Sequence, residues 1–258
     1  MNNISAWIGR RLDPSTPTGM EFTASLIVAG LGLAFFGGIL QGLHETDTIA
    51  HFDLFVGQAL IGLRSQSLTT FFEVLTGLAG TKGIILLLVT SFVLLLRSPY
   101  RQLPIVLGAG AAVELTVVVI VKLLVARPRP DQAIQLVHES SFSFPSGHTM
   151  AAVVVYGLLA YFISRTVSRG RKAAVIALWV VFAASVAASR IYLGVHYPSD
   201  TLASACLGGA SLSLGLAWLS RHETGLNPAI FDSYARIRLL TAIGITLLIV
   251  IIWRPFFI

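Results

Sequence analysis

Seven long apolar runs constrain the fold of this chain more than any other feature of its sequence. A helix needs about 20 mostly apolar residues to cross a bilayer core of about 30 Å, and in lipid only helices and closed barrels satisfy every backbone polar group. The runs therefore predict an all-α fold, a polytopic integral membrane helical bundle in which residues 1–258 form a single membrane domain. They cover residues 22–43, 76–96, 103–124, 147–164, 173–190, 199–219 and 237–253.

The composition excludes an ordinary soluble domain. Hydrophobic residues make up 55% of the chain and charged residues 12%, and the mean hydropathy is +0.81. The net charge of +6 does not indicate a nucleic-acid partner, because the basic residues fall in short loops between apolar runs, where they set membrane topology. The one cysteine, Cys206, lies inside an apolar run, so no disulfide within the chain is possible.

The loop charges also predict the orientation. Four loop regions collect Lys and Arg, and all four fall on one side of the membrane if the N-terminal segment, residues 1–20, is cytoplasmic. We therefore expect a bacterial inner (plasma) membrane protein, with the loops 125–146 and 191–198 on the periplasmic or extracellular face. The basic residues are Arg10 and Arg11; Arg97 and Arg101; Arg165, Arg169, Arg171 and Lys172; and Arg221, Arg236 and Arg238.

Residues 48–64 differ from the predicted spans. Apolar Phe52 and Phe55 interleave with polar His51 and Asp53, which is typical of an amphipathic helix that lies in the membrane interface. A buried re-entrant segment is the alternative.

The stretch Phe144-Pro145-Ser146-Gly147-His148 opens the fourth apolar run. Its amides are expected at a helix N-terminus, where backbone N–H groups and the positive end of the helix dipole bind phosphate well. The Ser146 hydroxyl can donate a further hydrogen bond, and Gly147 lets phosphate approach the main chain closely. His148 adds a proton carrier at the same place.

Two further clusters lie at the edges of neighbouring runs. Lys122 and Arg129 precede this stretch, and Arg190, His196 and Asp200 follow it. The loop charges place all three clusters on the same non-cytoplasmic face. The two arginines and the lysine supply the positive charge that holds a phosphoryl group, arginine through a planar fork of two parallel donors.

The two histidines suit the roles of nucleophile and leaving-group acid, because the pKa of histidine lies near neutrality. Asp200 follows His196 by four residues, so its carboxylate can accept from one ring nitrogen and leave the other free to attack. We therefore assign His196 as the nucleophile, Asp200 as its orienting partner and His148 as the general acid. Pro198 is expected in the first turn of the next helix.

Together, the clusters resemble the three-part signature of the type 2 phosphatidic acid phosphatase superfamily. The resemblance covers residues 100–215, the catalytic signature region. It implies a six-helix membrane core with residues 237–253 as an extra transmembrane helix, and metal-free hydrolysis through a phosphohistidine without a cofactor. The matching residues are Lys122, Arg129-Pro130, Pro145-Ser146-Gly147-His148, Ser189-Arg190, His196 and Asp200.

The expected substrate is a phosphate monoester or diphosphate ester of a lipid, such as undecaprenyl diphosphate, phosphatidylglycerol phosphate, phosphatidic acid or lipid A. A lipid phosphotransferase with a polyprenyl diphosphate donor is an alternative, and so is a non-enzymatic lipid transporter or scramblase. A vanadate-dependent haloperoxidase would have a similar anion pocket, but its soluble architecture fits badly with seven apolar runs.

Several further charged positions have two readings. Arg127 either contacts a lipid headgroup or a loop, or belongs to the site. Glu114, in the middle of a run, is expected to be protonated and hydrogen-bonded between helices rather than catalytic. Lys82 and Glu73 are expected to pair with each other or to bind headgroups, and the 131–143 loop is expected to be solvated rather than to cap the site.

Overall fold

A computed structural model describes residues 19–45, 47–98, 100–221 and 233–257, together with positions 9 and 13. The predicted all-α fold is confirmed, because the described part of the chain contains helices and turns and no strand. The elements are α2 (Met20–Glu45), α3 (Asp47–Ile61), α4 (Gln66–Ala79), α5 (Thr81–Leu95), α6 (Leu103–Val125), a short 3₁₀ helix η1 (Gln132–Ile134), α7 (Gly147–Arg165), α8 (Arg169–Tyr192), α9 (Pro198–Arg221), α10 (Ser233–Ile252) and α11 (Arg254–Phe257).

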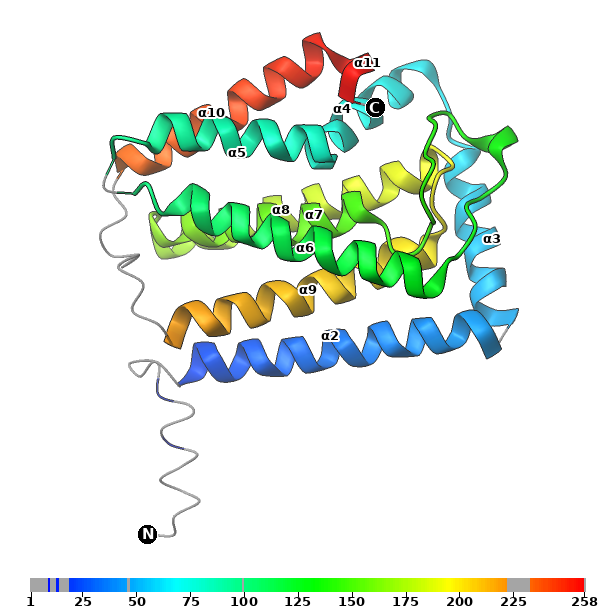
Figure 1. The fold of residues 1–258 in the computed structure, drawn as a ribbon, viewed down its shortest axis with the longest axis horizontal. Coiled ribbons are helices and arrows are strands. Elements are labelled where there is room, and N and C mark those ends of the chain that lie inside the picture. The colour runs from blue at the N-terminus through cyan, green and yellow to red at the C-terminus, as the bar shows by residue number, and fades with distance from the viewer. Residues whose placement is uncertain are drawn as a thin grey trace.

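The long helices form a bundle with α7 at its centre. Helix α7 packs against α6, α8 and α9, while α2 lies along α9 on one side and α10 lies along α5 on the other (Figure 1). Within their apolar windows, 72% of α7 is buried and only 6% of α2. Small residues on α7, such as Ala151, Ala152 and Ala160, allow this close packing, which is how helices associate in a membrane.

Within the described residues, five helices, α2 and α6 to α9, are long and apolar enough to cross a bilayer, and α4 with α5 counts as a sixth if that pair is one span. The predicted span over residues 76–96 is not one continuous helix, because its first residues belong to α4 and the rest to α5. The chain bends there by 57°, at Gly80, which has an extended conformation with φ −74° and ψ 161°. Glycine disfavours a helix interior, so the break falls at Gly80. The seventh predicted run, 237–253, corresponds to α10, which begins four residues earlier and ends one residue earlier.

Helix α3 crosses one end of the bundle, roughly at right angles to the long helices (Figure 1). It covers most of the stretch predicted to lie in the interface. Phe55 is 77% exposed, whereas Asp53 is 5% exposed. An exposed apolar face beside a buried acid fits a helix whose outer face meets lipid and whose inner face meets the loops of the protein.

The C-terminal helices close over the α4–α5 break. Arg254 Nε lies 3.2 Å from Glu73 Oε2. Lys82 donates to the Phe256 carbonyl, and its Nζ lies 4.2 Å from the centroid of the Phe256 ring. Of the two expectations for these residues, the pairing of Lys82 with Glu73 is not observed, because each has a partner in α11, and headgroup binding stays a prediction. The α10–α11 segment thus covers the outer side of the break.

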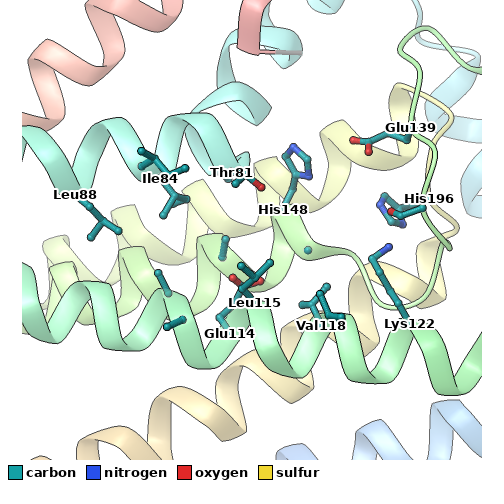
Figure 2. Close-up of a pocket in the computed structure, with 18 of the residues that line it drawn as sticks. Thr81, Ile84, Leu88, Glu114, Leu115, Val118, Lys122, Glu139, His148 and His196 are labelled. Carbon is teal, nitrogen blue, oxygen red and sulfur yellow. The ribbon is translucent and has the colours of Figure 1, made fainter.

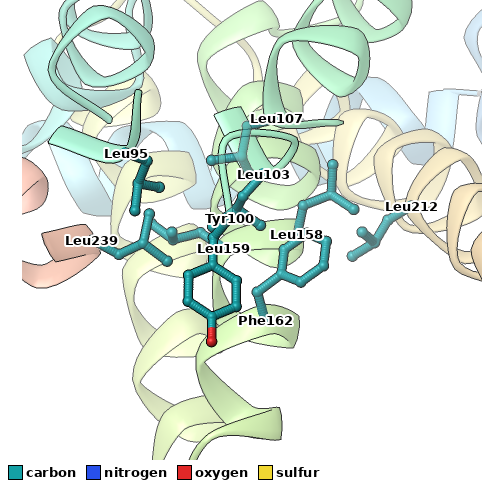
Figure 3. Packing of buried hydrophobic residues seen from close by; sticks show 9 residues of the cluster. All are labelled: Leu95, Tyr100, Leu103, Leu107, Leu158, Leu159, Phe162, Leu212 and Leu239. Carbon is teal, nitrogen blue, oxygen red and sulfur yellow. The ribbon is translucent and has the colours of Figure 1, made fainter. Parts of the chain in front are cut away.

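The end of the bundle opposite α3 contains a hydrophobic cluster (Figure 3). The residues come from the C-terminal ends of α5 and α7, the turn between α5 and α6, the start of α6, and from α9 and α10. Because lipid tails are as apolar as leucine, such contacts stabilise a membrane bundle through van der Waals packing rather than through exclusion of water. The buried members are Leu95, Tyr100, Leu103, Leu107, Leu158, Leu159, Phe162, Leu212 and Leu239.

Candidate active site

The three sequence clusters meet at the end of the bundle that α3 crosses (Figure 1). Lys122 lies in the last turn of α6 and Arg129 in the loop after it, residues 126–146. His148 lies in the first turn of α7, and His196 lies in the loop between α8 and α9. These four side chains and Gly147 line one cavity of about 420 Å³. Figure 2 shows the two histidines on different walls of this cavity.

Ser146 caps the N-terminus of α7. Its Oγ accepts from the Thr149 N–H at 3.4 Å and from the Thr149 hydroxyl at 3.1 Å, which is why serine is favoured at this position. The Ser146 N–H donates to Ser204 Oγ at 2.6 Å, and the Ser204 hydroxyl donates to the Asp200 carbonyl. Ser146 is fully buried. Its hydroxyl, which was predicted to bind phosphate, does not line the cavity, whereas the neighbouring Gly147 does.

The carboxylate of Asp200 holds His196 by the predicted i,i+4 contact. Its Oδ2 lies 3.4 Å from His196 Nδ1. The same oxygen accepts from the Tyr197 N–H at 2.9 Å and from the Ser143 hydroxyl, and Oδ1 accepts from Arg127 Nη1 at 2.6 Å. Asp200 is fully buried, so these donors stabilise its ionised form, and the carboxylate in turn orients the imidazole.

His196 presents its other nitrogen to the cavity. Nε2 lies 3.2 Å from Arg129 Nη1. Burial lowers the pKa of His196 to about 4, although Asp200 acts in the opposite direction. The imidazole is therefore neutral at pH 7. With its Nδ1–H assigned toward Asp200, Nε2 is unprotonated and accepts the hydrogen bond from the Arg129 guanidinium.

His148 lies against the break between α4 and α5. Its side chain has no hydrogen-bond partner among the residues that the structure describes. A Cβ atom built on Gly80 would lie 3.0 Å from its Nε2, and Thr81 lines the cavity next to it (Figure 2). The imidazole is therefore positioned by packing against the backbone of the break.

Arg129 and Lys122 are held over the cavity by main-chain carbonyls. Arg129 donates from Nε to the Ser141 carbonyl and from Nη1 to the Val195 carbonyl, each at 2.6 Å. Lys122 donates to the Phe142 carbonyl. Among the described residues, Lys122 forms no ion pair. Arg129 pairs with Glu139, whose Oε2 lies 3.7 Å from Arg129 Nη2.

Arg190 lies behind the cavity wall rather than on it, and it is 1% exposed. Nη1 donates to Thr76 Oγ1 at 3.1 Å, and Nη2 donates to Glu139 Oε1 at 2.5 Å. Its Nε is buried and has no hydrogen-bond partner among the described residues. The guanidinium of Arg190 therefore does not line the cavity itself but binds Glu139, which does.

The sequence pattern does not single out Glu139, although the residue contacts two of the predicted phosphate-binding arginines. It belongs to the 131–143 loop, which is expected to be solvated, but it lines the cavity. Burial alone would raise the pKa of Glu139, and the charges of Arg190 and Arg129 outweigh it, so the pKa lies below its usual value. The signal that could find it is charge balance, because Glu139 is an acid in a loop that joins two cationic clusters.

Arg127 belongs to the site as a support of Asp200, and neither a headgroup contact nor a plain loop contact describes it. Nη2 contacts Asp53 Oδ2 at 2.7 Å while Nη1 binds Asp200. The guanidinium also stacks on the Tyr197 ring, 4.0 Å from its centroid. Asp53 further accepts from the Ser199 N–H and hydroxyl, each at 2.7 Å. This network connects helix α3 to Asp200, the partner of His196.

The cavity continues away from the histidines between α5 and α6. Ile84 and Leu88 face Gly108 and Leu115 there, so this arm is largely apolar. Glu114 lies on its wall and is 7% exposed. The predicted interhelical hydrogen bond of Glu114 is not observed, because its carboxyl has no partner among the described residues. A second cavity of about 550 Å³ adjoins the polar end along the 126–146 loop.

None of the described residues form a cluster of three or more His, Cys, Asp or Glu side chains that could hold a metal ion.

Comparison with known proteins places this arrangement in a group of membrane phosphatases. A model described as the PAP2 superfamily matches residues 103–223. Phosphatidylglycerophosphatase B of Bacillus subtilis is 36% identical over 197 residues, which cover 73% of this chain and 91% of that protein. Decaprenylphosphoryl-5-phosphoribose phosphatase of Mycobacterium tuberculosis is 39% identical over 110 residues, 40% of this chain and 54% of that protein.

A solved structure has the same fold. The crystal structure of a transmembrane PAP2 type phosphatidylglycerolphosphate phosphatase from Bacillus subtilis superimposes with a TM-score of 0.66 at 28% sequence identity. The match covers 72% of this chain and 93% of that one.

Proposed function

Because this chain belongs to the PAP2 superfamily, we propose that it is a membrane phosphatase that removes a terminal phosphate from a lipid by way of His196. It acts as a hydrolase on lipid phosphate esters. One observation carries the proposal most directly. The unprotonated nitrogen of a neutral, buried histidine, His196, lies 3.2 Å from Nη1 of Arg129 in a cavity that continues into an apolar arm.

The reaction follows from the positions of the two histidines. His196 Nε2 attacks phosphorus, a P–N bond forms, and the ester P–O bond breaks. The departing oxygen takes a proton from His148, and Asp200 stabilises the positive charge that develops on the His196 ring. Water then attacks the phosphohistidine, with His148 as base, and releases orthophosphate. Lys122, Arg129 and the Gly147 amide stabilise the negative charge of the phosphoryl group throughout.

The shape of the cavity supports a lipid as the leaving group. The phosphate lies among the cations, and the hydrocarbon lies in the arm between α5 and α6, which is lined by Ile84, Ile85 and Leu88 on one side. Phosphatidylglycerol phosphate is the first substrate to test, since the relative that covers 73% of this chain is a phosphatidylglycerophosphatase. A polyprenyl-linked phosphate is the second, in view of the decaprenyl-type relative.

The site is proposed to face the periplasm or the extracellular space. The loops that join α5 to α6 and α7 to α8 lie at the end of the bundle opposite the site (Figure 1). Arg97 and Arg101 lie in the first of these loops, and the basic stretch 165–172 covers the second loop and the helix ends on either side of it. The positive-inside tendency therefore puts the site on the other face.

Phosphate release by the purified protein tests the function. The panel contains phosphatidylglycerol phosphate, undecaprenyl diphosphate, phosphatidic acid and lipid A, each in detergent micelles with a chelator present, and His196→Ala is the control. Orthophosphate from at least one lipid, absent in His196→Ala, is the expected result. Transfer to an added lipid acceptor without free orthophosphate would indicate a phosphotransferase, and activity restored only by added metal would contradict the metal-independent mechanism.

A further inference from the structure

Glu139 places a carboxylate where the phosphate of a substrate has to bind. Its Oε1 lies 2.5 Å from Arg190 Nη2, and its Oε2 lies 3.7 Å from Arg129 Nη2. Figure 2 shows the carboxylate reaching from the 126–146 loop toward His148. A carboxylate and a phosphate both present two oxygens to an arginine fork, so the protein's own acid makes the contacts that a phosphate would make.

Arg190 shows that this contact is incomplete. A bidentate oxyanion uses two adjacent N–H groups of a guanidinium. In Arg190, Nη2 is bound to Glu139 and Nη1 is bound to Thr76, while the buried Nε has no partner in the described part of the chain. Buried donors are seldom left without an acceptor. The unpartnered Nε is therefore a donor available to an anion that binds more fully than the single carboxylate does.

The two partners differ in how freely they can move. The Arg190 side chain is 2% exposed and the Glu139 side chain is 28% exposed. Arg190 extends from the last turn of α8, whereas Glu139 lies in the 126–146 loop, outside its short 3₁₀ helix. The carboxylate is thus the group that can be displaced, while the guanidinium stays in place.

A phosphate bound to Arg190 and Arg129 would lie a few ångströms from the Glu139 carboxylate. The two anions repel each other, because like charges this close in a partly buried site interact strongly. We propose that Glu139 is a specificity-determining residue that occupies the anion seat of Arg190 and Arg129 and gives it up only to a phosphate anchored by a lipid. This inference rests on the proposed function, because it concerns the same site.

The proposed consequence is discrimination between lipid-linked and free phosphate. Free orthophosphate has to displace the carboxylate with its own charge alone. A lipid substrate also places its hydrocarbon in the arm between α5 and α6, and this binding compensates for the displacement. Glu139 therefore weakens binding of the reaction product, orthophosphate, more than binding of the substrate.

Isothermal titration calorimetry of orthophosphate with the purified protein in micelles, at pH 7 and low ionic strength, tests this directly. Glu139→Gln keeps a hydrogen-bond acceptor for Arg190 and removes the charge, so we expect orthophosphate to bind at least about tenfold more tightly. The matched control is Asp131→Asn, which removes a charge from the same loop, where Asp131 accepts from the Ala133 N–H. We expect a change of less than about twofold in the control.

A second measurement separates displacement from mere support of the arginines. In Glu139→Gln, the Michaelis constant for the lipid should fall by a smaller factor than the dissociation constant of orthophosphate. Weaker or unchanged orthophosphate binding in Glu139→Gln, or an equal gain in Asp131→Asn, overturns the inference. If Glu139→Gln unfolds, Glu139→Asp shortens the reach to both arginines and should also tighten orthophosphate binding. Calorimetry needs no turnover, so a wild-type protein that hydrolyses no lipid would refute the proposed function without obscuring this result.

Discussion

His196 and His148 line the same cavity, but the protein holds them in different ways. His196 is bound to Asp200, whose carboxylate also accepts from a hydroxyl, a main-chain amide and a guanidinium. His148 has no hydrogen-bond partner among the described residues, and it lies against the backbone of the α4–α5 break at Gly80. One histidine is oriented by a polar network and the other by packing.

The difference matches the two proposed roles. A nucleophile must direct one particular nitrogen at phosphorus, which requires a fixed tautomer and ring orientation. A leaving-group acid must lie within reach of the departing oxygen, and a ring held by packing depends for this on the main chain beside it. We call the side of the cavity around His196 and Asp200 the polar wall, and it should tolerate little chemical change. The side around His148 and Gly80 is the packed wall, and it should be sensitive to the position of the main chain.

The largest expected effect is the loss of the nucleophile. His196→Ala should lower the rate of phosphate release by about 10⁴-fold or more, because no covalent intermediate can form. The measurement is orthophosphate release from phosphatidylglycerol phosphate under saturating conditions. Activity within tenfold of the wild type would remove His196 from the role of nucleophile.

Loss of the acid should depend on the leaving group. His148→Ala should lower turnover of a lipid phosphate by about 10²–10⁴-fold. The loss should be clearly smaller for a nitrophenyl phosphate, whose leaving group needs little protonation. The check is the ratio of the two losses, measured on the same preparation. Equal losses on both substrates would contradict the assignment of His148 as the acid.

The support from helix α3 should be worth less than either histidine. Arg127→Gln leaves Asp200 with fewer donors, so we expect a fall in kcat of about 10–100-fold with little change in KM. Asp53→Asn should act through the same network. The double variant should therefore lose much less than the product of the two single losses. Independent, multiplicative losses would show that Asp53 does not act through Arg127.

The polar wall was the more predictable of the two from sequence. The i,i+4 spacing of His196 and Asp200 on either side of Pro198, and the helix start at Gly147, are local features that short-range rules describe. The position of Arg127 between Asp53 and Asp200 is not local, because it joins residues from α3 and α9. Its two neighbours in the sequence pattern, Lys122 and Arg129, give no sign of that contact.

The packed wall was not predictable for a different reason. Residues 76–96 form one continuous apolar run, and hydropathy does not register a bend inside such a run. Only the contacts of Gly80 with His148, and of Thr76 with Arg190, show that the break forms part of the site. The role of Glu139 was not predictable either, since its partners Arg129 and Arg190 belong to different sequence clusters and meet only in the folded protein.

A methyl group at the break tests the packed wall alone. Gly80 has φ −74°, which alanine adopts without strain, so Gly80→Ala changes mainly the 3.0 Å contact with His148 Nε2. We expect about a tenfold loss of kcat on lipid, since small displacements of a catalytic group are costly. The matched control is Gly37→Ala on α2, where a Cβ atom meets nothing within 4 Å. Equal effects of the two substitutions would argue against positioning of His148 by the break.

The last expected effect is that of pH on the polar wall, and it is measured on stability rather than on turnover. The pKa of His196 is lowered to about 4 by burial, so the neutral form persists down to that pH, whereas an ordinary histidine is half protonated near pH 6.5. Because the folded-state pKa lies below the unfolded one, this group's contribution to the free energy of unfolding is complete above about pH 6.5. It is lost as the pH falls toward 4, by roughly 3 kcal/mol in total. Nitrogen-15 NMR of labelled histidines, with the His196 signal identified from His196→Ala, should show a midpoint near 4, and a midpoint near 6.5 would mean that the nucleophile is not desolvated as the structure has it.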